Sequence, residues 1–242
     1  MNREYYKWYS PHLSKEMELL VFGHAGTPVL FFPTRTARFF DYENWKVIDA
    51  IADKIDNGWL QVYCVDSVDA ESFYCSCSHP SERILRHNQY ESYIVNEVIP
   101  LIWYKNPNRY IIATGCSLGA YHAVNISFRH PHLFGKTVGM SGRYDLTIQS
   151  ENFNDLFDGY EDENIYFHMP TRYIPNLTDE TILDQIRKLD IVLAIGKEDP
   201  FYPNNEFLHE VLLAKEINNT LHLWEGEAHR PRYWQQMVQY FL

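Results

Sequence analysis

The chain has 242 residues, 45% of them hydrophobic and 22% charged, a balance typical of folded globular proteins rather than disordered or fibrous ones. This length fits one large α/β domain over residues 1–242 better than two small domains. The formal charge of −11, without any basic run, argues against a nucleic-acid partner, and no stretch approaches the roughly 20 apolar residues of a membrane span.

Strands and helices alternate along the first part of the chain. The segments "EYYKWYS", "EMELLVFG" and "PVLFFP" predict three strands, and apolar residues then recur at helical spacing from Asp41 to "DNG". After the strand "WLQVYCVDS", residues 82–104 carry an apolar stripe typical of a helix lying on a sheet, with Pro100 expected to bend its last turn. The strand "YIIAT", the turn "GCSLG", the helix "AYHAVNISFRHP" and the strand "KTVGMS" follow.

Residues 147–178 interrupt this alternation. The segment is acidic and aromatic with little periodicity, so we expect an excursion over the C-terminal edge of the sheet that could form a small lid. Its aromatic side chains could contact an organic or sugar-ester ligand, although such side chains more often pack inside. They are Phe153, Phe157, Tyr160, Tyr166, Phe167 and Tyr173.

The alternation resumes with a helix near 179–189, the strand "DIVLAIG", the helix "NNEFLHEVLLAKEI", the strand "TLHLWEG" and a final helix "YWQQMVQYFL". Strands that alternate with helices are typical of a mostly parallel sheet covered on both faces. The sequence therefore predicts the α/β fold class.

The cysteines and the N-terminal residues indicate the cellular compartment in which the protein is expected. The N-terminal "MNREYYKWYS" lacks the apolar segment of a secretion signal, so we expect reduced thiols and a cytoplasmic protein. Cys75, Cys77 and His79 form a C-x-C-x-H pattern, but no second ligand pair follows at zinc-site spacing. We therefore expect a plain loop there, no metal site and no cofactor.

A G-x-S-x-G motif, made by Gly115, Ser117 and Gly119, lies between a predicted strand and a predicted helix. This context is that of a nucleophile elbow, a sharp turn that exposes the serine hydroxyl at the edge of the sheet. Glycines on either side avoid collisions between strand and helix, and the middle residue is held in a strained conformation. Ser117 is therefore the predicted nucleophile, whereas Cys116 should face sideways as a small buried residue.

A serine hydroxyl needs a histidine base that is itself oriented by a carboxylate. In hydrolases of this architecture the chain order is serine, acid, histidine. This order favours His229, which lies in the loop between the predicted strand "TLHLWEG" and the last helix. The other histidines after the serine lie beside the elbow, in the excursion, within a helix or in a strand: His122, His130, His132, His168, His209 and His222.

The predicted acid is Asp199 in "GKEDP". It follows a parallel strand, and the proline after it favours an extended loop from which a short side chain can point toward the histidine. Glu198 and Asp145 remain alternatives, because each also lies in a loop after a strand.

An oxyanion hole would take one N–H from Leu118, directly after the nucleophile, and a second from the loop after an early strand. Pro33 has no N–H, so the second donor is Arg35 or Thr34. The side chains of Arg35 and Arg38 also offer cations near the pocket mouth.

With these motifs in place, the chain resembles the esterase family of α/β-hydrolases that includes esterase D, enterobactin esterase and the mycolyltransferases. The resemblance is clearest over 110–142, in "GCSLGAYHAVNISFRHPHLFGKTVGMSG", and continues at "GKEDP" and "GEAHRPRYWQQMVQYFL". It implies an α/β-hydrolase fold over nearly the whole chain. It places the family's nucleophile, acid, base and two oxyanion donors on Ser117, Asp199, His229, Leu118 and Arg35.

We therefore expect a serine hydrolase that cleaves a small-molecule carboxylic ester through an acyl-enzyme. Two alternatives stay open: an acyltransferase that uses the same triad, and a catalytically weak binding or scaffold protein. The second alternative is motivated by the first oxyanion loop, which lacks the glycine common in relatives. A homo-oligomer also stays open, because the aromatic last helix could pack inward or on a second copy.

Overall fold

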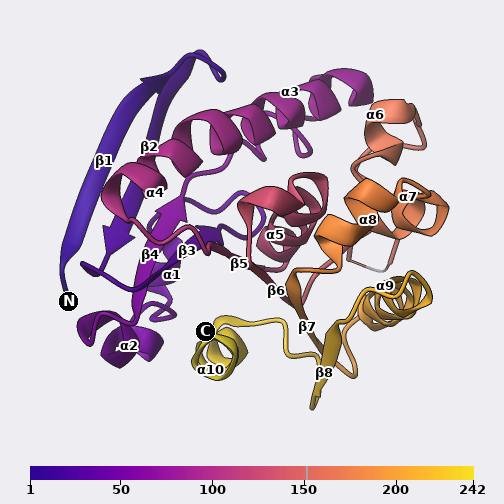
Figure 1. Ribbon diagram of the computed structural model, residues 1–242. Helices are drawn as coiled ribbons and strands as arrows, with labels where there is room; N and C mark the ends of the chain where they lie inside the picture. Colours follow the sequence, from indigo (N-terminus) through magenta and orange to yellow (C-terminus); the bar gives the residue numbers. More distant parts are fainter. Residues whose placement is uncertain (151) are drawn as a thin grey trace.

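An eight-stranded sheet runs through the centre of the molecule (Figure 1). The computed structural model describes residues 1–150 and 152–242. In space the strands follow the order β1-β2-β4-β3-β5-β6-β7-β8. They are β1 (Arg3–Ser10), β2 (Lys15–Phe22), β3 (Thr27–Phe32), β4 (Leu60–Val65), β5 (Ile112–Cys116), β6 (Lys136–Met140), β7 (Asp190–Gly196) and β8 (Thr220–Trp224).

The strands from β4 to β8 in this order pair in parallel, whereas β1 pairs antiparallel with β2 and β2 antiparallel with β4. Parallel strands share one carboxyl edge, and the loops that leave this edge are where such sheets place functional side chains. The mostly parallel sheet predicted from the sequence is confirmed, and its carboxyl edge positions the site described below.

Helices cover both faces of the sheet (Figure 1). One face carries α3 (Pro80–Tyr93), α4 (Ile99–Lys105), α5 (Leu118–Arg129), α8 (Glu180–Ile186) and α9 (Tyr202–Ala214). The other carries α1 (Asp41–Asn44), α2 (Ala52–Asp56) and α10 (Pro231–Phe241). In the described part of the chain, every helix is too short or too polar to span a bilayer.

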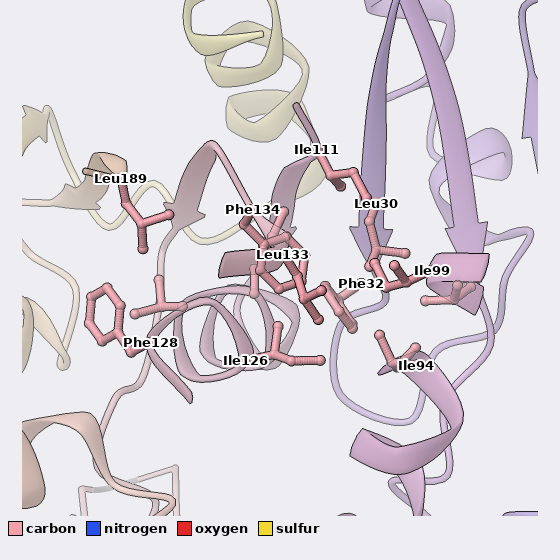
Figure 2. Close-up of a cluster of buried hydrophobic side chains, with 14 of the residues drawn as sticks. Leu30, Phe32, Ile94, Ile99, Ile111, Ile126, Phe128, Leu133, Phe134 and Leu189 are labelled. Atoms are coloured by element: carbon pink, nitrogen blue, oxygen red, sulfur yellow. The ribbon is translucent and has the colours of Figure 1, made fainter. Parts of the chain in front are cut away.

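Successive side chains of the central strands pack in the cores on opposite faces of the sheet, because side chains alternate along a strand. In β3, Leu30 and Phe32 belong to the core under α3, α4 and α5, whereas Val29 and Phe31 belong to the core on the opposite face. Figure 2 shows Leu30 and Phe32 in the same apolar cluster as side chains from α4 and α5. This two-sided burial explains why the strand reads as a continuous apolar run.

The single helix expected from Asp41 to "DNG" is wrong. The segment forms α1, a short 3₁₀ turn over Asp49–Ile51, and α2. Lys46 interrupts it with a φ of 60°, a left-handed conformation that no α-helix accommodates. Apolar spacing alone did not reveal this break.

The long helix on the opposite face begins at Pro80 and ends at Lys105, close to the predicted 82–104. Its middle turn, Ile94–Val98, is a wider π-type turn that joins α3 to α4. Pro100 follows this turn in the first turn of α4, and because it has no N–H for a carbonyl one turn earlier, it fits where the regular hydrogen-bond pattern of the helix is already interrupted. The expected disturbance therefore lies before the proline rather than in the last turn.

The excursion over 147–178 contains two short helices, α6 (Glu163–Tyr166) and α7 (Pro170–Asn176). Residue 151 of this segment lies outside the described residues. Phe157, Ile165 and Met169 are buried and form a small apolar cluster with the elbow helix residue Tyr121. Much of the segment therefore packs against the body of the domain and does not behave as a separate lid.

Candidate active site

The turn between β5 and α5 has the geometry of a nucleophile elbow. Ser117 lies between the two elements with φ 57° and ψ −120°, a conformation that costs a non-glycine residue free energy. The N–H of Ser117 donates a hydrogen bond of 2.8 Å to the carbonyl of Met140 in β6, which fixes the turn. The side chain reaches the cavity at the carboxyl edge of the sheet.

Both glycines of the motif are required by close backbone approaches. A Cβ on Gly115 would lie 2.3 Å from the carbonyl of Gly119, and a Cβ on Gly119 would lie 2.3 Å from the carbonyl oxygen of Phe32. Either distance is far inside van der Waals contact. The steric role that the sequence assigns to the glycines is therefore present in the structure.

Cys116 faces the core on the α10 side of the sheet and is completely buried. Its backbone N–H donates to the hydroxyl of Tyr42, which in turn donates to the carbonyl of Phe32. Burial raises the pKa of the Cys116 thiol well above its ordinary value, so the thiol stays protonated. Cys116 is a packing residue, as expected.

His229 and Asp199 meet beside Ser117, although the three residues come from loops after three different strands. His229 Nε2 lies 2.9 Å from Ser117 Oγ, and His229 Nδ1 lies 2.7 Å from Asp199 Oδ2. The other carboxylate oxygen of Asp199 accepts a 2.8 Å bond from the N–H of Phe201. The side chain of Asp199 is completely buried, so the carboxylate is held in one position beneath the imidazole.

The loop that carries His229 is held against the sheet at two points. The hydroxyl of Ser141 donates to the carbonyl of Ala228 at 2.8 Å. Gly196 at the end of β7 lies so close to the loop that a Cβ there would approach the carbonyl oxygen of Glu227 to 2.1 Å. These contacts hold the loop, and with it the histidine, against the sheet.

The alternative acids lie elsewhere. Glu198 is exposed, and Asp145 accepts bonds from Thr147 and Arg172. Of the histidines set aside in the sequence, His122 pairs with the buried Asp69 rather than with the serine. The structure thus brings together the predicted serine, acid and histidine and leaves the alternatives outside.

The predicted oxyanion residues line the same cavity as the serine. Leu118, Thr34 and Arg35 all border it, and among the described residues no acceptor engages the N–H of any of the three. The loop after β3 therefore lies next to the elbow with free donors. Its geometry leaves both Thr34 and Arg35 open as the second donor.

The cavity has a volume of about 440 Å³, enough for a small organic molecule. Of the six aromatic residues suggested from the excursion, Phe153 borders it, whereas Phe157 and Tyr173 are buried in packing. The sequence did not single out the other aromatic walls, because they come from distant segments. These walls are Trp45, Tyr74, Phe201 and Trp234.

Arg35 and Arg38, both expected at the mouth of the pocket, lie in different places. Arg35 borders the cavity, but Arg38 turns away and pairs with Asp66 and Glu18. The suggested cation role of Arg38 at the mouth is therefore wrong. Arg143, which the sequence did not highlight, borders the cavity instead.

The C-x-C-x-H segment lies away from the serine. His79 Nδ1 accepts a bond from the N–H of Ser81 and caps α3, and Cys75 and Cys77 are free thiols whose sulfurs lie 2.7 Å apart. A different trio in the described chain, His87, Glu91 and His168, holds its ligand atoms within 4.8 Å of one another. Glu91, however, already accepts bonds from Arg129 and His130.

Comparison with known proteins places this site in a family. The family described as "Putative esterase" matches residues 37–239. Among curated protein sequences, none gives a significant match.

Solved structures share the fold at low sequence identity. A ferulic acid esterase is 14% identical, with a TM-score of 0.78 over 100% of this chain and 96% of that one. An S-formylglutathione hydrolase from Agrobacterium tumefaciens is 14% identical, with a TM-score of 0.72 over 98% and 93%. MPT51 (FbpC1) from Mycobacterium tuberculosis is 11% identical, with a TM-score of 0.70 over 98% and 95%.

These likenesses show that the α/β-hydrolase fold extends over the whole chain, as the sequence predicts. The match over 37–239 supplies the activity class. The chain therefore belongs to the esterase family of α/β-hydrolases and is a carboxylic ester hydrolase.

Proposed function

We propose that the chain hydrolyses a small-molecule carboxylic ester through an acyl-enzyme on Ser117. The observation that carries this proposal is the continuous chain from Asp199 through His229 to the serine oxygen, with contacts of 2.7 and 2.9 Å. A carboxylate only accepts hydrogen bonds, so Nδ1 of the histidine donates to it. Nε2 is then left with a lone pair that can accept the serine proton.

In the first half of the reaction, Ser117 Oγ attacks the ester carbonyl carbon while His229 takes the hydroxyl proton. Collapse of the tetrahedral intermediate breaks the bond to the alcohol oxygen, and the imidazolium returns its proton to that oxygen. Asp199 stabilises the imidazolium and keeps the ring oriented. In the second half, water attacks the acyl group with the same histidine as base and releases the carboxylic acid.

The negative oxygen of the tetrahedral intermediate needs fixed donors. The N–H of Leu118 supplies the first, and the N–H of Arg35 or Thr34 supplies the second. Free donors on both sides of the elbow support this assignment. Each such donor typically contributes about 10²–10³ in turnover.

The binding or scaffold alternative has no support from this geometry, since it expects the serine out of reach of the histidine. Acyl transfer to an alcohol uses the same residues and differs in the acceptor of the acyl group. Product analysis with added alcohols separates it from hydrolysis. A cytoplasmic location stays a prediction, and the oligomeric state stays open.

The test compares two neighbouring residues on a panel of 4-nitrophenyl esters of increasing acyl length. Ser117→Ala removes the nucleophile, so turnover should fall at least about 10⁴-fold with the fold retained. Cys116→Ala removes a buried thiol beside it and should cost about 1 kcal/mol of stability while turnover persists. The proposal fails if Ser117→Ala keeps wild-type turnover, or if Cys116→Ala alone abolishes it.

A further inference from the structure

Arg143 is a buried cation that borders the Ser117 cavity. It follows β6 and is 5% exposed, and its Nη2 donates to the carbonyls of Leu146, Ile148 and Asn154 at 2.7, 2.6 and 2.7 Å. Among the described residues, no carboxylate lies within the 4.0 Å of an ion pair with it. Carbonyl dipoles therefore stabilise its charge directly, and Asp145 and Asp155 act on it only from beyond ion-pair distance.

A guanidinium in this position keeps its charge. Burial lowers the pKa of Arg143 from its ordinary value, but arginine remains protonated in proteins. A buried cation without a carboxylate in direct contact is costly, and an anion that enters the site would relieve that cost. Nη1 of Arg143 has no acceptor among the described residues, so it has N–H groups free for such an anion.

The guanidinium lies beside two aromatic rings that pack against each other, with their ring centres 4.6 Å apart. Its central carbon lies 6.0 Å from the ring centre of Phe153 and 5.3 Å from that of Phe201. Both rings border the same cavity as Ser117. A planar donor that packs beside aromatic rings and donates to three carbonyls loses little entropy when it binds an oxyanion.

A second arginine joins it at the same place. Arg35 and Arg143 both border the Ser117 cavity and also a neighbouring cavity of about 530 Å³, with Tyr74 at the junction. The Arg35 side chain is exposed, its central carbon lies 5.7 Å from the ring centre of Tyr74, and no ion pair with a described carboxylate occupies it. Two unpaired guanidinium groups thus converge beside the proposed nucleophile of a chain whose net charge is −11.

The acidic groups of these cavities are engaged elsewhere. Asp41 accepts the N–H of Arg38, and Asp158 pairs with Arg83 at 2.8 Å. Asp155 accepts two backbone N–H groups of its own loop. Among the described residues, no carboxylate of either cavity forms an ion pair with Arg143 or Arg35, because Asp158 is paired with Arg83 and the other two are oriented by backbone N–H groups.

We propose that the ester substrate carries an anionic oxygen group, a carboxylate or a phosphate, which Arg143 and Arg35 bind while the ester carbonyl lies at Ser117. This assignment rests on the proposed function and adds the substrate class. Arg143 acts as the principal binding residue because it is buried and fixed. Arg35 adds a weaker, solvent-screened contact at the mouth.

The experiment measures kcat/KM for matched 4-nitrophenyl esters: the half-ester of adipic acid, its neutral methyl ester, and an analogue with a terminal phosphate. Wild-type protein should prefer at least one anionic ester over the neutral one. Arg143→Met should reduce this preference by about 10- to 100-fold, the effect of losing a charged hydrogen bond. Arg35→Met should reduce it less, and the exposed Arg109→Met, which lies outside both cavities, should leave it unchanged.

The two anionic esters show which oxyanion the site takes. Should Arg143→Met fail to fold, Arg143→Lys and Arg35→Met carry the same comparison, with smaller expected losses. Ser117-dependent cleavage without any preference for an anionic ester, or a preference that no arginine variant changes, overturns the inference and leaves the proposed function standing. Absence of Ser117-dependent cleavage for every ester overturns both.

Discussion

The molecule contains two histidine–carboxylate pairs of similar geometry in very different settings. His229 and Asp199 lie 2.7 Å apart, and His122 and Asp69 lie 3.0 Å apart. The side chains of the first pair are 12% and 0% exposed, and those of the second are 2% and 1% exposed. Both carboxylates are thus buried, and the pairs differ in the access of the histidine.

The surroundings of each ring agree with the different roles that we propose for the two histidines. The free nitrogen of His229 faces Ser117 at a cavity, whereas the ring of His122 packs near Phe32 and Phe73, with ring centres 5.9 and 6.0 Å away. A histidine–carboxylate pair therefore acts as a base only where a nucleophile and a substrate can reach it. Where such a pair is buried among aromatic rings, it contributes to the stability of the fold.

The largest expected difference in turnover is between variants of Asp199, the acid of the accessible pair, and of its neighbour Glu198. Asp199→Asn should reduce turnover by about 10²–10⁴-fold, because an amide no longer holds the imidazole in the tautomer that accepts the serine proton. Glu198→Gln, one residue earlier and exposed, should stay within about two-fold of wild type. Steady-state kinetics on a neutral 4-nitrophenyl ester compares them, and equal losses in both variants would remove Asp199 from its role.

The two histidines should separate activity from stability. His229→Ala should abolish most turnover with little change in the free energy of unfolding, since its ring borders a cavity. His122→Ala should destabilise the protein by about 2–4 kcal/mol, because it leaves a void and an unpaired buried Asp69. Urea unfolding measures both values, and a stable His122→Ala protein would contradict the structural role.

A smaller effect comes from His87, which packs beside the buried pair with its ring centre 5.4 Å from that of His122. Burial holds the pKa of His87 well below 6.5, and the neighbouring His168 and His122 add to the shift. The unfolded chain therefore binds one more proton below pH 6.5. Stability should fall by about 1.4 kcal/mol per pH unit as the pH drops below that value.

The contribution of His87 to the pH dependence of stability can be separated from that of Glu91 above pH 5. Burial alone would raise the pKa of Glu91, but hydrogen bonds from His130 and Arg129 hold it below 4.5, so its contribution to stability is lost only at more acidic pH. His87→Phe keeps a ring of similar size and removes the titrating group. Thermal unfolding between pH 7 and 5 should show a shallower decline in the variant, and parallel curves would contradict the assignment.

The accessible site could be predicted largely because its signals are local. The elbow consists of five consecutive residues, the G-x-S-x-G motif. Asp199 and His229 each follow a strand at the shared carboxyl edge. The role proposed for Arg143 depends on the path of the excursion, whose carbonyls hold the guanidinium. No spacing in the sequence indicates such a contact.

The aromatic walls were missed for the same reason. Trp45 and Trp234 lie at one cavity although 189 positions separate them (234 − 45). The broken helix after Asp41 shows a further limit, since one left-handed residue, Lys46, interrupts a regular apolar spacing. Local periodicity predicts elements, whereas contacts between distant loops follow only from the assembled fold.

Covalent labelling tests the central claim most directly. A fluorophosphonate probe, followed by peptide mapping, should modify Ser117 in the folded protein and should fail to do so in His229→Ala or in denatured protein, because the serine is activated by the histidine. Labelling at another serine, or equal labelling of Ser117 with and without His229, would contradict the account.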